Sequence, residues 1–242
     1  MEAVHFENVK YSYRDDGQDF AVNGVTLSIE EGQFVAVLGR NGSGKTTFIK
    51  LMCRLYDVTD GEILINGENI QAYTKESITA LYSVVFQDFK IFSVPLRDTV
   101  CAGSAFDRDK LYTCLENANI KERVECLPHQ ENTYLYKDLN KGGVEISGGE
   151  AQKLALARAL YKDAPVVVLD EPTAALDPIA ENEIYSRFNS FVQSKTAIYI
   201  SHRLSSCVFC DTIAVFDHAR LVESGTHTAL LAADGQYAAL WN

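Results

Sequence analysis

Long hydrophobic segments are missing from this sequence. No apolar run approaches the ~20 residues that a helix needs to span a bilayer, and the first residues, Met1 to Phe6, have no signal-peptide character. We therefore expect the chain by itself to be soluble. Internal repeats, low-complexity stretches and linkers are missing too, and 242 residues can bury a substantial core, so we expect one compact unit.

Positive charge is scarce. The chain carries 33 acidic side chains against 22 lysines and arginines, which gives a formal net charge of −11. A surface that neutralises a nucleic-acid backbone needs the opposite balance. We therefore expect no nucleic-acid partner.

Cysteines are few and scattered, at positions 53, 101, 114, 126, 207 and 210. A chain of this size needs no disulfides to be stable, so we expect reduced cytosolic thiols. Cys207 and Cys210 are closely spaced, but a zinc site needs about four ligands and no second pair of Cys or His stands at ligand spacing. We interpret them as partly buried thiols on a helix.

A glycine-rich loop is the most informative segment. Residues Gly39 to Thr47 match the phosphate-binding pattern G-x-x-x-x-G-K-[ST] at every fixed position. The apolar run Phe34–Leu38 precedes this phosphate loop, and apolar residues recur at helical spacing after it. Its glycines let backbone N–H groups converge on phosphate oxygens, and Lys45 adds a full charge beside the helix N-terminus. Thr46 offers its hydroxyl to Mg²⁺.

A second apolar run ends in two carboxylates. Pro165 to Leu169 predicts a buried strand, and Asp170 and Glu171 follow it. Acidic side chains there are costly unless they bind a cation or take part in chemistry. Asp170 is placed to order the Mg²⁺ of a bound nucleotide and Glu171 to polarise an attacking water. A structural cap is the alternative.

Several further strands are predicted. Residues 4–13 and 27–29 alternate between apolar and polar and predict an antiparallel edge hairpin around the turn Asp15–Gly17. The others are 62–67, closed by an Asn-Gly turn, 84–86, 196–201, and a closing hairpin of 212–216 and 221–225; helices are expected at about 180–192 and over the tail, 226–242. His202 stands at the end of strand 196–201, where parallel α/β sheets collect functional residues, so it is a candidate γ-phosphate sensor.

A helical insertion is expected at about 89–163. The periodicity is helical from Leu96 to about Cys126, and Pro95 suits a helix start.

A capped helix is expected later in this insertion. Ser147 and Glu150 fit the S-x-x-E capping box before an apolar stripe. Gly148 and Gly149 would leave the first backbone N–H groups of this helix open to an anion. A capped amphipathic helix without a ligand is the alternative.

With these motifs in order, the chain resembles the nucleotide-binding domain of ABC transporters over essentially its whole length. The motifs are the phosphate loop, Gln87, the signature segment Ser147–Glu150, Asp170-Glu171, Asp177 and His202. The resemblance implies an α/β fold, a P-loop NTPase (RecA-like) core with an antiparallel β subdomain and an inserted helical subdomain. In this single domain, 1–242, the ATP-binding core would be 1–88 and 164–242 and the helical signature subdomain 89–163.

The resemblance also implies roles for individual residues. Tyr13 corresponds to the tyrosine that stacks on adenine, although a strand aromatic is the ordinary alternative. Catalysis is expected from Lys45, Gln87, Glu171 and His202. The expected nucleotide-binding residues are Tyr13, Gly39, Asn41, Gly42, Ser43, Gly44, Lys45, Thr46, Thr47, Ser147, Gly149 and Asp177, and the expected Mg²⁺ ligands are Thr46, Gln87 and Asp170.

The resemblance further implies cofactors and partners. In that family two domains enclose two ATP molecules, each between one phosphate loop and the partner's signature. ATP, Mg²⁺ and a second nucleotide-binding domain, identical or different, are therefore expected, with closure that depends on ATP. Segments 91–93, 201–205 and 235–240 resemble exporters. This implies a transmembrane domain as partner, a place at the cytoplasmic face of the membrane, and an excised domain or separate subunit that starts at Met1.

Two departures from the family pattern stand near the signature. The signature commonly ends in Gln, so Glu150 either is turned back toward its own helix by the capping box or repels a γ-phosphate. Exporters commonly carry Thr-Glu-Val-Gly-Glu before the signature, whereas residues Lys137 to Lys141 read Lys-Asp-Leu-Asn-Lys. That stretch usually faces the membrane domain. The substitution resembles bacterial peptide or bacteriocin exporters, which favours peptide export.

Two hypotheses of function follow. The first is the ATP-hydrolysing motor domain of an ABC exporter, because no catalytic position is missing. The second is a regulatory module that binds ATP and hydrolyses little; Glu171 and His202 argue against it and Glu150 for it. A soluble ABC protein acting on ribosomes or DNA would need basic surfaces or long insertions, which the sequence does not show.

Overall fold

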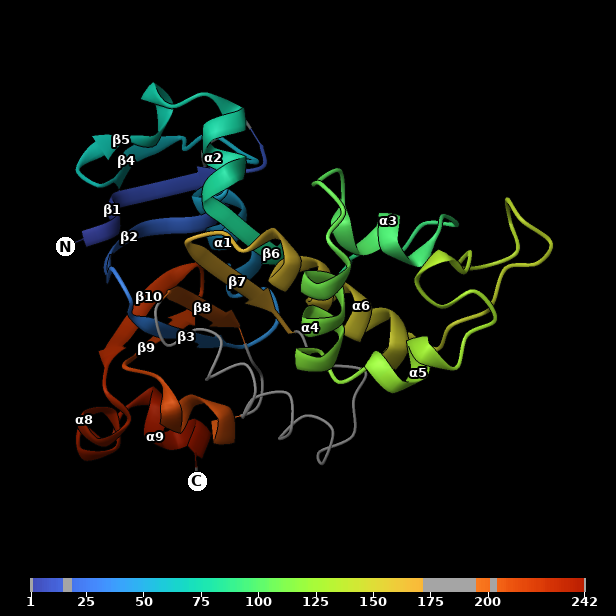
Figure 1. Ribbon diagram of the computed structural model, residues 1–242. Helices are drawn as coiled ribbons and strands as arrows, with labels where there is room; N and C mark the ends of the chain where they lie inside the picture. The colour runs from blue at the N-terminus through green and yellow to red at the C-terminus, as the bar shows by residue number, and fades with distance from the viewer. Residues whose placement is uncertain (1, 15–18, 172–194, 201–203, 242) are drawn as a thin grey trace. The chain divides into compact units, whose positions relative to one another are not determined.

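The computed structural model describes residues 2–14, 19–171, 195–200 and 204–241 (Figure 1). By its internal contacts the chain divides into two units. The first holds Met1–Tyr82, Pro165–Asp170 and Ser194–Asn242, and the second holds Ser83–Ala164 and Glu171–Gln193. The domain bounds expected from the sequence, with the helical part at 89–163, stay a prediction.

The first unit contains an antiparallel sheet. Its strands are β1 (Glu2–Ser12), β2 (Phe20–Glu30), β4 (Asp60–Ile65) and β5 (Glu68–Asn69), in the order β2-β1-β4-β5. Val4 and Phe6 of β1 are buried, as the predicted alternation requires. The predicted hairpin of β1 and β2 is confirmed. Of these two strands only β2 lies at an edge of the sheet, because β4 pairs with the other side of β1. The turn Asp15–Gly17 lies outside the described residues.

A second sheet in this unit brings strand ends together. The strands that this unit contributes to it are β3 (Phe34–Gly39), β7 (Val166–Asp170), β8 (Thr196–Ile200), β9 (Thr212–Asp217) and β10 (Arg220–Gly225), in the order β10-β9-β3-β8-β7. β3 is parallel to β8 and β9, β7 is parallel to β8, and β10 returns antiparallel to β9. Every residue of β7 and β8 is buried, which explains their unbroken apolar runs. Since these strands are parallel, Gly39 and Asp170 end at the same edge.

Helix α1 (Lys45–Met52) connects the two sheets by packing. Its buried Phe48 lies between Phe6 of β1 and Phe216 of β9, with ring centroids 4.3 and 5.2 Å apart. The remaining helices of this unit are η1 (Ile70–Ala72), α2 (Lys75–Leu81), η3 (Leu204–Phe209), α8 (His227–Ala232) and α9 (Gln236–Trp241).

The predicted helical tail, 226–242, is broken. Asp234 has φ 51°, which ends the first helix, and α9 starts two residues later. The carboxylate of Glu223 accepts a hydrogen bond from the Tyr237 backbone N–H over 2.9 Å. A side chain from β10 thus satisfies the first turn of α9, so one continuous helix is not needed.

The second unit is helical. After β6 (Tyr82–Val85), whose first residue closes the first unit, come α3 (Leu96–Cys101), α4 (Arg108–Asn117), α5 (Lys121–Glu125), η2 (Gln130–Asn132) and α6 (Gly148–Lys162). In Figure 1 these helices form the green and yellow part of the ribbon. Both α3 and α4 pack against α6.

The helical periodicity predicted from Leu96 to about Cys126 is confirmed, but the stretch is not one helix. Three short helices fill that stretch, and the start after Pro95 is confirmed. Ala102, with φ 46°, ends α3, and Asn119, with φ 55°, lies between α4 and α5. Each adopts the left-handed conformation that terminates helices.

Candidate nucleotide site

The phosphate loop joins β3 to α1 and its backbone is drawn very close to neighbouring strands. A Cβ at Gly39 would collide with the Phe216 carbonyl oxygen, and one at Gly44, where φ is 101°, would collide with the Ala21 carbonyl oxygen. A side chain at either position would therefore force the loop open. These glycines keep the loop tight enough for its N–H groups to converge.

Two side chains of the loop point inward. Lys45 is 6% exposed, and its Nζ donates to the carbonyl oxygens of Gly39 and Arg40 over 2.8 and 3.0 Å. Ser43 is 3% exposed, and within the described part of the chain its Oγ has no hydrogen-bond partner. A buried hydroxyl without a partner is costly. An ammonium and this hydroxyl at the start of α1 fit a phosphate group.

A hydroxyl and a carboxylate meet beside the loop. Thr46 Oγ1 donates to Asp170 Oδ2 over 3.1 Å, and Asp170, the last residue of β7, is 1% exposed. Hard oxygen donors of this kind are what Mg²⁺ binds, usually with phosphate oxygens and water completing its shell. The donor set therefore fits Mg²⁺.

Tyr13 lies just beyond the end of β1 and is 57% exposed. Its ring meets those of Tyr11 and Tyr56 edge to face, with centroids 5.0 and 5.6 Å apart, and its hydroxyl is 3.0 Å from Thr47 Oγ1. The ring is thus held next to the phosphate loop while much of it faces solvent. This is the geometry a base platform needs.

In the second unit, the structure brings two predicted catalytic residues together. Gln87 Nε2 donates to Glu171 Oε2 over 3.0 Å. Glu171 has φ 51°, a left-handed conformation that costs a non-glycine residue about 1–2 kcal/mol. Such strain is common at functional sites.

The signature segment starts α6 with the predicted capping box, which is confirmed. Glu150 N donates to Ser147 Oγ over 3.2 Å, and Glu150 Oε2 accepts from Ser147 N over 2.7 Å. The other carboxylate oxygen, Oε1, accepts from Arg123 Nε over 2.6 Å. Burial alone would raise the pKa of Glu150, but the hydrogen bonds from Ser147 and Arg123 outweigh it and hold this pKa below its usual range.

Sequence reasoning missed the partners Arg123 and Gln152. Arg123 lies in α5, and Gln152 donates from α6 to the Glu171 carbonyl oxygen over 3.1 Å. A polar Gln152 on the buried side of an otherwise apolar helix is the signal that could have found the second contact. Asp177 and His202, two further predicted site residues, lie outside the described residues.

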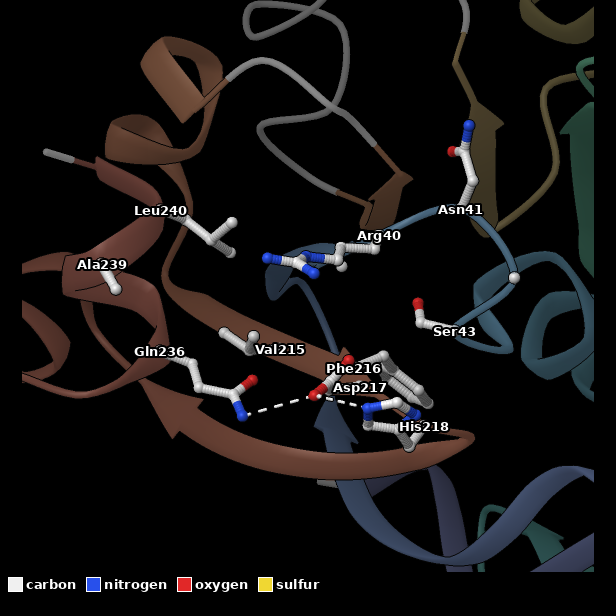
Figure 2. A pocket seen from close by; sticks show the side chains of 12 residues that line it. Arg40, Asn41, Ser43, Val215, Phe216, Asp217, His218, Gln236, Ala239 and Leu240 are labelled. Atoms are coloured by element: carbon white, nitrogen blue, oxygen red, sulfur yellow. Dashed lines mark hydrogen bonds and ion pairs between the residues drawn. The ribbon is translucent and has the colours of Figure 1, made fainter.

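A cavity of about 410 Å³ opens beside the phosphate loop in the first unit (Figure 2). Arg40, Asn41 and Ser43 line it on the loop side, and it reaches the β9–β10 turn and α9. Asp217 Oδ2 lies 3.7 Å from His218 Nε2 and accepts from Gln236 Nε2 over 3.4 Å. The cavity thus borders Gly39, Asn41, Gly42 and Ser43 among the predicted nucleotide-binding residues.

The glycine loop between a parallel strand and a helix, with an acidic residue ending another parallel strand of the same sheet, defines a P-loop NTPase. The chain belongs to the ABC transporter family, whose model matches residues 22–174. It is an ATP-binding domain of this ATPase family, which confirms the predicted family and α/β fold class. Among the described residues, no helix is long and apolar enough to cross a membrane.

Similar proteins are transporters much longer than this chain. An ATP-dependent lipid A-core flippase of Haemophilus ducreyi is 38% identical over 241 residues, which are 99% of this chain and 40% of that protein. ABC transporter B family member 6 of Dictyostelium discoideum is 34% identical over 253 residues, covering 100% of this chain and 36% of that protein. The structure of a bacterial Atm1-family ABC exporter with ATP bound matches 99% of this chain and 41% of its own, with a TM-score of 0.91 at 35% identity. The chain thus spans about 40% of the length of its relatives.

Proposed function

We propose that this chain is the ATP-hydrolysing motor domain of an ABC exporter. The observation that carries the proposal is the pair of Thr46 and Asp170 beside the buried Lys45, because it combines a metal donor set with a phosphate-binding cation. The similarity to flippases and to an exporter over nearly the whole chain supports the same function.

The first unit would bind MgATP. Lys45 and the N–H groups of the phosphate loop would hold the phosphates, and Tyr13 would stack on the adenine ring. Thr46 and Asp170 would hold Mg²⁺, with Gln87 as a further ligand. When bound, Mg²⁺ supplies positive charge that offsets the negative charge growing on the transferred phosphoryl group.

Glu171 would act as the general base. Its carboxylate would accept a proton from the attacking water, and the hydrogen bond from Gln87 would orient that carboxylate. By resemblance, Gln87 and His202 would also sense the γ-phosphate. Because Gln87 touches Glu171 directly, a change at the sensor would reach the base without an intermediate residue.

Export would need two such domains and a membrane part. Ser147 and Gly149 of one chain would meet the nucleotide on the other, with Asp177 nearby, so that ATP closes the pair and hydrolysis releases it. A transmembrane domain, on the part of the relatives that this chain does not match, would select the cargo and hold the pair at the cytoplasmic face of the membrane. Two cargo classes are proposed: the peptide predicted from residues 137–141, and a lipid, because the flippase relatives are named for lipid A-core. The helical part at 89–163 and the core at 1–88 and 164–242 are the proposed domains.

The test is the variant Glu171→Gln with Glu76→Gln, an exposed residue of α2, as the matched control. Removing a general base typically lowers a rate by about 100-fold or more, so turnover of ATP with Mg²⁺ should fall by that factor. The Kd for ATP should stay within about threefold, since a glutamine keeps the size of the side chain. Hydrolysis equal to the control would exclude this role for Glu171.

A further inference from the structure

A buried amide of helix α6 contacts the backbone of Glu171. Gln152 is 5% exposed, and its Nε2 donates to the Glu171 carbonyl oxygen over 3.1 Å. At the other end of the same residue, Glu171 Oε2 accepts from Gln87 Nε2 over 3.0 Å. One glutamine thus holds the backbone of Glu171 and another holds its carboxylate, and all three residues belong to the second unit.

We propose that Gln152 is a positioning residue for Glu171, acting through the backbone. The proposal rests on the proposed function, in which Glu171 is the general base. Glu171 is held at φ 51°, a backbone conformation that residues other than glycine rarely adopt. The backbone angles of a residue set the directions of both its carbonyl group and its side chain. A donor fixed on the carbonyl oxygen therefore also fixes the direction in which the Glu171 carboxylate leaves the chain.

The effect on catalysis follows from geometry. A general base works only within hydrogen-bond reach of the proton that it removes. Without the amide of Gln152, the Glu171 peptide can relax toward an ordinary backbone conformation, and the carboxylate moves with it. The contact with Gln87 does not prevent this, because it holds a single carboxylate oxygen at the end of a flexible side chain.

The contact of Gln152 with Glu171 also connects Glu171 to the helix that carries the signature segment. Gln152 lies on α6 in the turn that follows the signature segment, about 8 Å along the axis from Ser147. One helix therefore carries both the segment proposed to meet the partner's nucleotide and the contact that orients the base of its own chain. A helix turn is stiff, so a shift of the signature segment is passed to Glu171.

The test replaces Gln152 by methionine, which keeps the length of the side chain and removes the donor. Gln71→Met, an exposed residue of η1, is the matched control. We expect kcat of Gln152→Met to fall about tenfold or more, because a displacement of about 1 Å at a reacting group has effects of this size. The Kd for ATP should stay within about threefold of the control.

A second readout separates positioning from mere support of the helix. It uses the Glu171→Gln background, which should hold ATP without turnover. ATP-dependent pairing of chains, measured by sedimentation, should be equal in that background with and without Gln152→Met. Gln152→Asn, which keeps the amide but is one methylene too short to reach, should lower kcat in the same way and carries the test if the methionine variant does not fold.

The outcomes distinguish this inference from the proposed function. Full turnover of ATP by Gln152→Met and Gln152→Asn, while Glu171→Gln is inactive, would overturn the positioning role and leave the proposed function intact. Pairing that weakens as much as kcat would also overturn it, because Gln152 would then act on the signature helix alone. Turnover that persists in Glu171→Gln would instead overturn the proposed function itself.

Discussion

At the scale of single residues, Glu150 puts a negative charge at the start of α6, where the family pattern commonly has an uncharged glutamine. Both of its carboxylate oxygens already accept hydrogen bonds, one from Ser147 and the other from Arg123. Arg123 is 44% exposed, so water screens part of this attraction. The charge is thus turned toward its own helix and is partly neutralised, which weakens the support for a regulatory module.

We expect Glu150→Gln to change ATP-dependent pairing by less than about threefold, and Arg123→Ala to weaken it by up to about fivefold. An exposed ion pair contributes up to about 1 kcal/mol, and the arginine variant leaves the carboxylate without its cation. The effect of Arg123→Ala should vanish when Glu150→Gln is also present. Sedimentation with ATP in the Glu171→Gln background measures all four combinations. Pairing strengthened about tenfold by Glu150→Gln alone would instead support repulsion and the regulatory hypothesis.

The sequence singled out the residues of the phosphate loop and of the β7 end because each motif is local. Lys45, Thr46 and Asp170 follow strong patterns, and the structure brings the last two within 3.1 Å. The contacts of Gln152 and Arg123 could not be predicted in the same way. They join residues 19 and 27 positions apart, on elements whose packing no local pattern specifies.

At the scale of elements, the β9–β10 turn carries avoidable strain. Its two central residues, His218 and Ala219, have φ 45° and 64°, and both are left-handed, as two-residue hairpins of this type require. Glycine usually fills such positions, because a Cβ there costs about 1–2 kcal/mol. The turn also anchors the first sheet, since Asn23 N donates to the Ala219 carbonyl oxygen over 2.7 Å.

Ala219→Gly should therefore raise the free energy of unfolding by about 0.5–1 kcal/mol. The relief of left-handed strain exceeds the entropy that glycine loses on folding, about 0.5–1 kcal/mol. Urea unfolding measures the difference. Ala80→Gly, in the exposed part of α2, is the matched control and should lower stability by about 1 kcal/mol. Equal losses in both variants would show that the Ala219 methyl group contributes more by packing than it costs in strain.

The helices of the second unit show which feature of an element the sequence does not predict, namely where a helical stretch is divided. Apolar periodicity predicts helix from Leu96 to about Cys126, but it does not say where the stretch is divided into separate helices. What divides it is packing: Leu111 and Leu115 of α4 and Leu154 of α6 are all buried, and α3 packs on α6 as well. Two short helices can each turn an apolar face toward α6, which a single straight helix cannot do.

At the scale of the whole molecule, the net charge of −11 acts on pairing. Two copies of the chain carry the same sign and repel at long range, and salt shortens the reach of this repulsion to about 10 Å at 0.1 M. The proposed pairing around ATP must therefore overcome a repulsion that depends on ionic strength.

We expect the rate of ATP hydrolysis per chain to rise with protein concentration. When NaCl is increased from about 0.05 to 0.3 M, this rise should begin at a lower protein concentration, because salt screens the repulsion between chains. The measurement is steady-state turnover at saturating ATP and Mg²⁺ across a dilution series, with Glu171→Gln as the blank. A rate per chain independent of concentration would contradict self-pairing. A shift to higher concentration in salt would show that complementary charges across the interface outweigh the net repulsion.

Helix α6 has its capped N-terminus at the signature segment and Gln152 one turn further on. In a pair of chains built on the proposed arrangement, the N-terminus of each α6 would contact the nucleotide bound to the partner chain. Through Gln152 the same helix would orient Glu171, the base that acts on the water at its own chain's nucleotide. The two ATP sites would then be coupled in time: ATP binding at one site would determine when hydrolysis can begin at the other. A domain that binds ATP but cannot hydrolyse it would still control when the partner domain hydrolyses its own ATP. A transporter with two unequal domains could therefore keep a function for both.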